Sequence, residues 1–316
     1  MPSITRANLP GAGAPKITFN GATLWTRGDF ILPLTHQLQE QVSSMYGRVT
    51  KTRQGRMITI NIPLYGFWSN LSVLFPSAFL NPVIGGRLFS TSDLAMTVLA
   101  RNGDKVVIKN VRLTKLANLK LAANAQVFSA DATFTALIAN GGDPTDANSF
   151  YTLTTGETYA EGDFPQSNFK SLTWTGAWGS RTGFTSILTQ EGWAIDWEIK
   201  TTPDLVDGIG PVDMFLDLCW CKASCLPVGP SLAQLMATDG AGLNFQGSEA
   251  AVGADIANDV DDLVLSDGTS SFTLKAAAMT DSGLVFAPSK KRIRPTVWEC
   301  TRGFTAGAGD AIAAVA

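Results

Sequence analysis

The chain has 316 residues, a formal net charge of −3, one histidine and four cysteines. Hydrophobic residues make up 45% and charged residues 16%, against roughly 25% charged residues in ordinary soluble domains. These values allow a sizeable core and two domains, and they do not suggest a secreted disulfide scaffold. The low charged content favours an assembly whose subunits cover one another.

The net charge is divided unequally along the chain. Residues 1–150 hold fourteen basic and seven acidic residues, a net of +7, whereas residues 151–316 hold ten basic and twenty acidic residues, a net of −10. Halves of opposite charge attract at short range, within one chain or between neighbouring chains.

Most of the predicted elements are strands. Arg56–Leu64 places apolar residues at a largely two-residue period, which is typical of a strand with one buried face, and Val212–Trp220 repeats the pattern. One short helix is expected after each of these strands, at Asn70–Leu80 and Pro230–Ala237. Further strands are predicted at Asp93–Ala100, Lys105–Leu113, Ala130–Leu137, Trp193–Lys200, Ser271–Ala277 and Arg294–Thr301.

Short matches between the two halves predict an internal repeat. Ile17–Gly28 matches Leu172–Gly183, and the strand ending at Trp68 matches the strand ending at Trp220. The longest match places Ile108 over Leu274 and Lys109 over Lys275. The same matching places Cys219 over Phe67 and Cys300 over Phe134. Because the matches keep their order, they predict two copies of one module.

Turn-rich segments divide the chain into the expected units. We predict a first module with an N-terminal arm at 1–147, a linker at 148–168 and a second module at 169–316. The spacing of the matches increases late in the second module, which predicts an inserted, exposed acidic loop around 235–270. The last eleven residues, AGAGDAIAAVA, are expected to form a flexible tail.

The sequence offers little for catalysis, and we expect no catalytic residue, no metal site and no cofactor. His36 is the single histidine, and Cys219, Cys221 and Cys225 lack the spacing of a zinc knuckle. In the repeat, Cys219 and Cys300 match aromatic positions, which favours small buried apolar residues over metal ligands. The N-terminus lacks an apolar signal core and no segment approaches the roughly 20 apolar residues that cross a bilayer, so we expect no membrane partner.

Two hairpin tips carry opposite charges. Arg48–Arg56 is basic and surrounds the turn Gln54-Gly55, whereas Thr201–Gly210 in the second module is acidic. Nucleic acid could bind the basic tip, but equivalent tips of opposite charge favour contacts between copies of the chain. The predicted subunit-interface residues are Arg48, Lys51, Arg53, Arg56, Asp204 and Asp207.

The layout resembles that of phage tail tube proteins. The resemblance depends on ITFNG near the start, a long charged hairpin, a strand ending in Trp, a short helix, and strand pairs such as DLAMTVLARNGDKVVIKNVRL and AQVFSADATFTAL. It implies a mainly β fold of two tandem β-sandwich or split-barrel modules, each with a flanking helix. Some long-tailed siphophages carry such a duplicated module and form trimeric, pseudo-hexameric rings.

The resemblance implies a structural virion protein of the phage tail, assembled in the host cytoplasm. Its partners would be further copies of itself in stacked rings, other tail proteins, and DNA that passes through the lumen without sequence-specific binding. A capsid decoration or host-recognition protein is the alternative. A glycosidase using Asp196 and Glu198 is a third possibility, although two acidic residues on one strand face are common.

Overall fold

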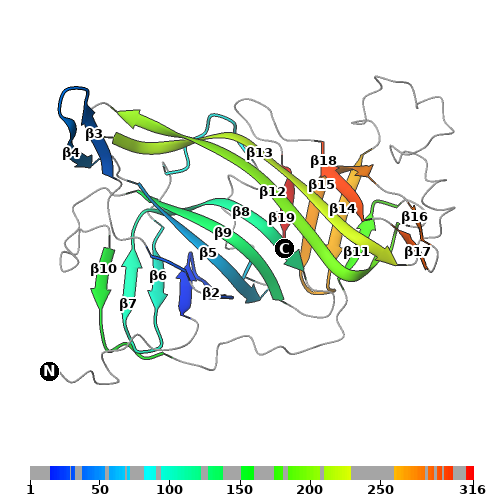
Figure 1. Ribbon diagram of the computed structural model, residues 1–316. Helices are drawn as coiled ribbons and strands as arrows, with labels where there is room; N and C mark the ends of the chain where they lie inside the picture. Colours follow the sequence, from blue (N-terminus) through cyan, green and yellow to red (C-terminus); the bar gives the residue numbers. More distant parts are fainter. Residues whose placement is uncertain are drawn as a thin grey trace.

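The structure is a computed structural model, and the chain is built almost entirely of antiparallel strands (Figure 1). The predicted mainly β fold is therefore confirmed. The structure describes residues 15–28, 30–32, 38–53, 57–67, 70–71, 82–89, 94–121, 127–137, 151–159, 174–180, 184–206, 210–228, 260–281, 284–287, 290–293, 295–301 and 311–316.

The described residues of the first half of the chain, between 16 and 154, contain ten strands. Their burial follows the two-residue period of the sequence: in β5, Ile58, Ile60 and Ile62 are buried while Thr59 and Asn61 are exposed. The strands are β1 (Lys16–Phe19), β2 (Ala22–Thr26), β3 (Leu38–Ser43), β4 (Gly47–Arg53), β5 (Met57–Phe67), β6 (Met96–Leu99), β7 (Lys105–Ile108), β8 (Val111–Leu121), β9 (Val127–Leu137) and β10 (Tyr151–Thr154).

The second half, between residues 175 and 315, contains nine strands in its described part. Its two longest strands, β12 and β13, form one hairpin that crosses most of the molecule (Figure 1). The strands are β11 (Thr175–Trp178), β12 (Leu188–Val206), β13 (Gly210–Val228), β14 (Asp261–Ser266), β15 (Ser271–Asp281), β16 (Leu284–Ala287), β17 (Lys290–Ile293), β18 (Thr296–Cys300) and β19 (Ala313–Val315).

One large sheet joins the two halves, in the order β10-β7-β6-β1-β2-β5-β9-β8-β12-β13-β18-β15-β14-β11, with β19 paired to β15. The sheet folds over itself within each half and encloses an apolar core. In the first half, Phe19 on β1 meets Phe134 on β9 with ring centroids 5.1 Å apart. In the second half, Trp178 on β11 meets Trp298 on β18 at 6.3 Å. The hairpins β3–β4 and β16–β17 form separate two-stranded sheets.

The same strand pairings recur in the two halves. In the first half β1 pairs with β6, β6 with β7, β8 with β9, and β9 with β5. In the second half β11 pairs with β14, β14 with the start of β15, the end of β15 with β18, and β18 with β13. We call two residues counterparts when they occupy the same place in these pairings. By this definition Phe19 corresponds to Trp178 and Phe134 to Trp298.

The hairpin leading into β5 has a counterpart of equal length in the second half. We call β3–β4, Leu38–Arg53, the first arm, and residues 201–216 of β12–β13 the second arm. Leu38 pairs with Arg53 in the first arm, and Thr201 with Leu216 in the second, so both ends lie 163 residues apart. Each arm has a β-bulge at the same step, after Gln41 in the first arm and after Asp204 in the second.

An unusual backbone conformation also recurs. Asn110 lies between β7 and β8 with φ 51°, and its counterpart Ala276 lies inside β15 with φ 44°. The carbonyl oxygen of each accepts a hydrogen bond from the strand beside it: Leu137 N donates to Asn110 O at 3.0 Å, and Thr301 N to Ala276 O at 3.1 Å. The predicted strand Lys105–Leu113 is therefore two strands, because the backbone turns at Asn110.

The structural counterparts agree with the longest sequence match and correct the others. Ile108 corresponds to Leu274, as predicted. The pairing of β18 makes Trp298, and not Cys300, the counterpart of Phe134, because Met279 faces Trp298 as Leu113 faces Phe134. Trp220 corresponds to Met57 and not to Trp68. Ala223 pairs with Trp298 as Ile60 pairs with Phe134, and Trp220 and Met57 each lie three residues before these positions.

This corrected register changes the predicted insertion. Counterparts are 163 residues apart before the segment between β13 and β14, as for Ile60 and Ala223, and 167 apart after it, as for Val98 and Leu265. The second half is thus four residues longer there. The exposed-loop prediction for 235–270 is wrong from residue 260 onward, because β14 pairs on both sides and buries Leu263 and Leu265; residues 235–259 lie outside the described residues.

Three further predictions concern segment ends. The linker prediction 148–168 is wrong for β10, which pairs with β7. The tail prediction is wrong for β19, which pairs with β15 next to the buried Ile312. Of the predicted helix Asn70–Leu80, Asn70 and Leu71 are helical, and the rest, like Pro230–Ala237, lies outside the described residues. No helix in the described part of the chain is long and apolar enough to span a bilayer.

Candidate assembly interface

The two halves are joined edge to edge by strands. The end of β8 in the first half pairs with β12 in the second, with Leu121 facing Trp193, Lys120 facing Ala194 and Leu119 facing Ile195. The apolar side chains of this joint are almost fully inaccessible: Trp193 and Leu119 are 1% exposed, and Ile195 and Leu121 are 0% exposed. The large sheet therefore continues from one half into the next without an open edge.

A second contact of this joint holds the second arm. Residues 82–89 of the first half lie along β13, where Gly85 N donates to Leu216 O at 2.8 Å and Leu216 N donates to Gly86 O at 3.0 Å. Leu88 N also donates to Met214 O at 2.9 Å. We call the β8–β12 pairing and this contact together the interhalf joint.

Side chains reinforce the contact with the second arm. Arg87 Nη2 forms an ion pair with Asp204 Oδ2 at 3.0 Å, and its guanidinium lies over the Phe215 ring at 5.4 Å. Asp213 is 5% exposed, and its Oδ1 accepts hydrogen bonds from Phe89 N at 2.9 Å and Met214 N at 2.7 Å. Such a satisfied buried carboxylate fixes the position of the arm more firmly than the partly exposed ion pair.

The predicted interface residues are only partly brought together. Arg48, Lys51 and Arg53 lie on β4 of the first arm, and Asp204 lies on β12 of the second. Asp204 does contact the other half, but its cation is Arg87 and not a residue of the basic arm. The charged positions are not counterparts, because Lys51 corresponds to Met214 and Asp204 to Gln41. Arg56, Asp207 and His36 lie outside the described residues.

Sequence reasoning missed the exposed apolar residues near these arms. Met45 and Tyr46 at the turn of the first arm are 79% and 77% exposed, and Leu205 on the second arm is 66% exposed. Ile31, between β2 and the first arm, is 81% exposed. Large exposed apolar side chains are typical of binding surfaces when they gather, and three of these four residues lie on the two arms. The run Phe30-Ile31-Leu32 was the available signal.

The four cysteines are buried thiols. Burial raises the pKa of Cys219 to about 12, and it raises the pKa of Cys221 well above the usual value. A thiol held neutral in this way is a poor nucleophile and a poor metal ligand at neutral pH. By the corrected register Cys221 and Cys225 correspond to Ile58 and Ile62, and Cys300 corresponds to Ala136, so these three thiols take apolar places. The predicted matches of Cys219 to Phe67 and of Cys300 to Phe134 are wrong, since Cys219 corresponds to Arg56, which lies outside the described residues.

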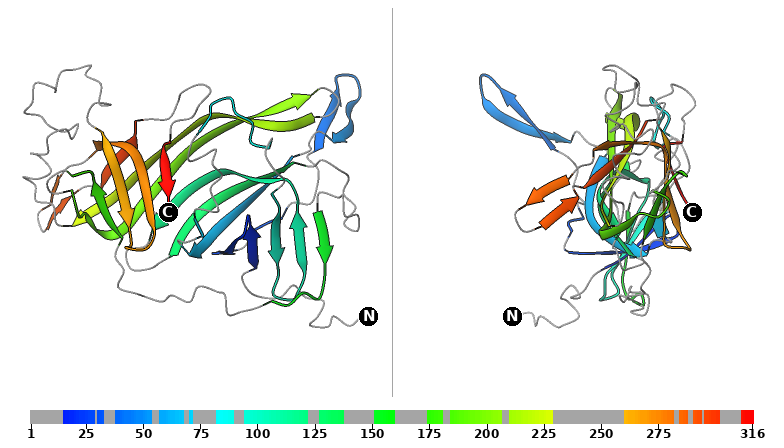
Figure 2. Two further views of the ribbon diagram at one scale, coloured as in Figure 1. Left: turned by 180° about the vertical axis from the view of Figure 1, so that it is seen from behind. Right: turned by 90° about the vertical axis from the view of Figure 1, so that its right-hand side faces the viewer.

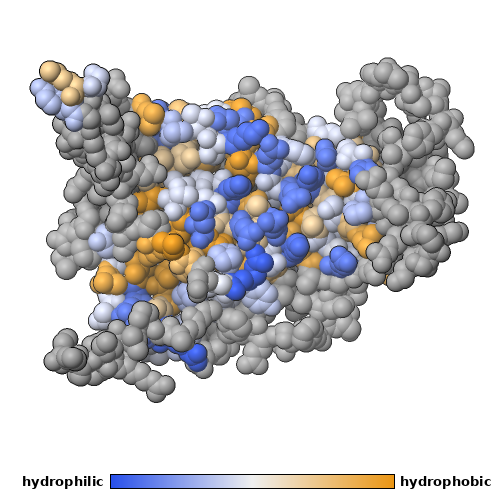
Figure 3. Space-filling model, in the orientation of Figure 1, coloured by the Kyte–Doolittle hydropathy of each residue, from blue (hydrophilic) through white to orange (hydrophobic). Residues whose placement is uncertain are grey.

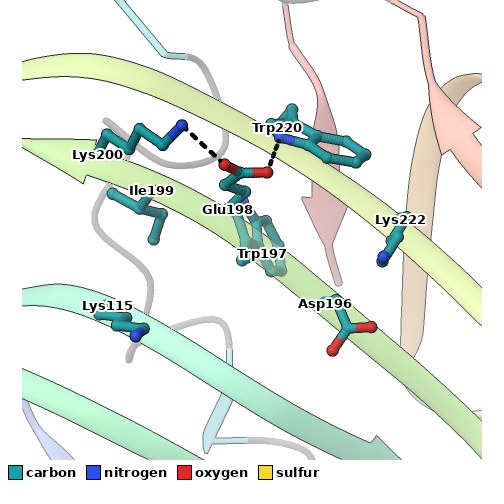
Figure 4. A pocket seen from close by; sticks show the side chains of 8 residues that line it. All are labelled: Lys115, Asp196, Trp197, Glu198, Ile199, Lys200, Trp220 and Lys222. Atoms are coloured by element: carbon teal, nitrogen blue, oxygen red, sulfur yellow. Dashed lines mark hydrogen bonds and ion pairs between the residues drawn. The ribbon is translucent and has the colours of Figure 1, made fainter.

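The acidic pair considered for glycosidase chemistry lines a shallow pocket on the outer face of β12 and β13 (Figure 4). Glu198 accepts a hydrogen bond from Trp220 Nε1 at 2.7 Å and forms an ion pair with Lys200 at 3.1 Å. The Lys200 contact, followed by the Trp220 hydrogen bond, lowers the pKa of Glu198. A general acid needs a raised pKa, so this geometry disfavours Glu198 as the proton donor.

The outer face around this pocket is strongly polar. Figure 3 shows hydrophilic residues spread over the central strands. Two of the basic side chains on this face pair with carboxylates, Arg27 with Asp131 at 2.8 Å and Lys200 with Glu198 at 3.1 Å. Comparison with known proteins adds no family assignment, since neither a family model nor a curated protein sequence matches this chain.

Proposed function

We propose that this protein is a structural virion protein, the subunit of a phage tail tube, and that it carries two copies of one module. Three chains would form a ring of six modules, and stacked rings would enclose a channel for DNA. The proposal places the protein in the virion tail, assembled in the host cytoplasm, with other tail proteins as further partners.

The observation that carries this proposal is the interhalf joint. It joins the end of β8 in one module to β12 in the next, so it uses two different surfaces of the module. A contact between unlike surfaces can be repeated from module to module, and such a series closes into a ring when the rotation fits. The recurring strand pairings of the two halves supply the repeated module that this geometry requires.

The polar outer face supports a role as a channel wall. Lysine and arginine side chains would hold the phosphates of passing DNA if they were left uncompensated. On this face Arg27 and Lys200 already pair with Asp131 and Glu198. The joined strands would therefore present a polar wall on which part of the positive charge is balanced, and this would help DNA to move without sequence-specific binding.

Electron microscopy of the purified full-length protein tests this function. We expect rings or tubes, with native mass spectrometry of the rings giving three chains each. Isolated globular particles at high protein concentration would contradict the proposal and favour a decoration or host-recognition protein. Hydrolysis of a glycan substrate that is abolished by Asp196→Asn would contradict it in favour of an enzyme.

A further inference from the structure

We propose that the segment Phe30–Leu32 of one chain pairs with β16, Leu284–Ala287, of a second copy of this chain, and that this contact reproduces the β8–β12 pairing between chains. This inference rests on the proposed function and identifies which residues would form its open joint. In the interhalf joint, residues 193–195 of β12 pair with the end of β8. Each of these two sides has a counterpart in the other half, and the two counterparts are not paired with each other.

The counterparts on the β12 side are fixed by pairings on both flanks. Thr26 faces Leu64 as Thr189 faces Pro227, and beyond them Leu38 faces Arg53 as Thr201 faces Leu216. The counterparts on each flank, Thr26 with Thr189 and Leu38 with Thr201, are 163 residues apart, so counterparts between the flanks have the same spacing. The joint residues Trp193, Ala194 and Ile195 therefore correspond to Phe30, Ile31 and Leu32, respectively.

The counterpart on the β8 side is β16. Lys115 faces Thr133 as Asp281 faces Val297, and each strand has a register shift just before this pair. The chain then continues to the end of β8 in the first half and to β16 in the second. Counted from Asp281, Phe286 takes the register position of Lys120. Counted through the pairing of β16 with β17, Leu284 takes that position, two residues away and therefore at the same alternation of the strand.

Phe30–Leu32 differs in burial from its counterpart in the interhalf joint. In the joint, Trp193 and Ile195 are buried and Ala194 is partly exposed. In the first half, Phe30 and Leu32 are partly buried against the core, whereas Ile31 is 81% exposed and the segment is not a strand. Apolar residues thus occupy all three positions, although no described strand pairs with them. This is expected of an unpaired strand edge that can bind another chain.

The two sides lie in different halves of the molecule. β2 and the first arm, which flank Phe30–Leu32 in the chain, belong to the first half, whereas β16–β17 lies at the far end of the second half (Figures 1 and 2). Surfaces that are separated in this way within one chain can meet between chains that are arranged head to tail. A second copy of this chain is therefore the partner that fits both surfaces.

Disulfide cross-linking between two variants tests the register. One variant carries Ile31→Cys, and the second carries Leu284→Cys, Val285→Cys or Phe286→Cys. The native cysteines are buried and should not compete. Ala194 faces Lys120 in the internal joint, so we expect Ile31→Cys to link to residue 284 or 286 at least tenfold more than to residue 285. Cross-linking must require both variants in the mixture.

The outcomes separate this inference from the proposed function. Rings of the wild-type protein without cross-linking at 284 or 286 would overturn the joint and leave the tail tube proposal standing. Equal cross-linking at all three positions would overturn the register. A wild-type protein that forms neither rings nor cross-links in any mixture would overturn both.

Blocking each side provides a second test. Ile31→Asp and Phe286→Asp place a charge on the two edges, and we expect each to reduce the assembled fraction at least tenfold in sedimentation velocity. Mixing them should give one pair of chains, because each retains one intact side. Leu153→Asp is the matched control, since Leu153 is 51% exposed but lies on β10, outside the joint. Normal assembly of folded Ile31→Asp would overturn the inference.

Discussion

The two arms have the same local structure but different surroundings. Each is a hairpin of sixteen residues with a bulge at the same step. The second arm is held by residues 82–89 of the first half, through backbone hydrogen bonds and the buried Asp213. The first arm forms a two-stranded sheet of its own, with Met45 and Tyr46 exposed at its turn. The same hairpin pairing thus occurs both within the large sheet and as a separate two-stranded sheet, so it does not require pairing with the large sheet.

The cores of the two halves differ in the sizes of two corresponding side chains. Substitution at this place gives the largest change in stability that we predict. Gly176 corresponds to Ile17, and Trp193 corresponds to Phe30. A Cβ atom at Gly176 would collide with the Trp193 indole. We expect Gly176→Ile to lower the free energy of unfolding by about 3 kcal/mol or more, measured by urea denaturation with circular dichroism.

A double variant sharpens this comparison. Gly176→Ile with Trp193→Phe installs the residue pair of the first half in the second half. We expect the double variant to recover at least half of the stability that Gly176→Ile loses, because the smaller ring makes room for the new side chain. Purely additive effects of the two substitutions would show that the two cores are not equivalent at this place.

The buried thiols predict a different response to alkaline pH in the two halves. Because burial raises the pKa of Cys219 to about 12, the native thiol keeps its proton while an unfolded thiol loses it near pH 8.5. The burial of the neutral thiols contributes fully to stability below about pH 8.5. This contribution is lost as pH rises toward 12, and for Cys219 alone the free energy of unfolding falls by about 1.4 kcal/mol per pH unit.

Urea denaturation under reducing conditions at pH 8 and pH 10 measures this loss. The matched variant replaces Cys219, Cys221 and Cys225 with Ala and should lose less stability between the two pH values than the parent protein. The first half has Ile58 and Ile62 in place of Cys221 and Cys225, so it lacks the contribution of these two thiols. An unchanged pH dependence in the variant would show that the thiols do not control the alkaline response.

The smallest predicted effect concerns the shared backbone turn. Ala276 adopts φ 44°, which costs an L-residue with a Cβ roughly 1–2 kcal/mol. Glycine removes this strain but makes the unfolded chain more flexible, so we expect Ala276→Gly to stabilise the protein by about 0.5–1 kcal/mol. Asn110→Gly should change less, because asparagine tolerates this region. Thermal unfolding compares both with Ala277→Gly, which should destabilise; destabilisation by Ala276→Gly would contradict this account.

Strand positions could be predicted from the sequence because burial on one sheet face leaves a two-residue period. This period located β5 and β9 closely. The basic hairpin tip predicted at Arg48–Arg56 is wrong, because Arg48–Arg53 belong to β4 and the turn of the first arm lies at residues 44–46. The full lengths of β12 and β13 could not be predicted, because β12 continues through the bulge near Trp193, where the period is interrupted. Strand pairing across the halves, as between β8 and β12, leaves no local pattern in either strand.

The register of the repeat was predicted correctly at only one place. Ile108 and Leu274 matched because the turn at Asn110 and Ala276 keeps both strands in step. Trp68 and Trp220 were paired because both are large aromatic residues, although structural counterparts exchange size freely, as Gly176 and Ile17 do. A better signal was available in the arms, where Gly47 and Gly210 begin the second strand at the same place in hairpins of equal length.

The interhalf joint has a kinetic consequence because its two sides belong to one polypeptide. A tether raises the effective concentration of the β8 and β12 edges to roughly the millimolar range, far above that of separate subunits. In a ring built from this contact, every second junction would already be closed when the chain folds. A trimer would then need three encounters where six single modules would need six, so joining the two halves in one chain would lower the critical concentration for ring formation.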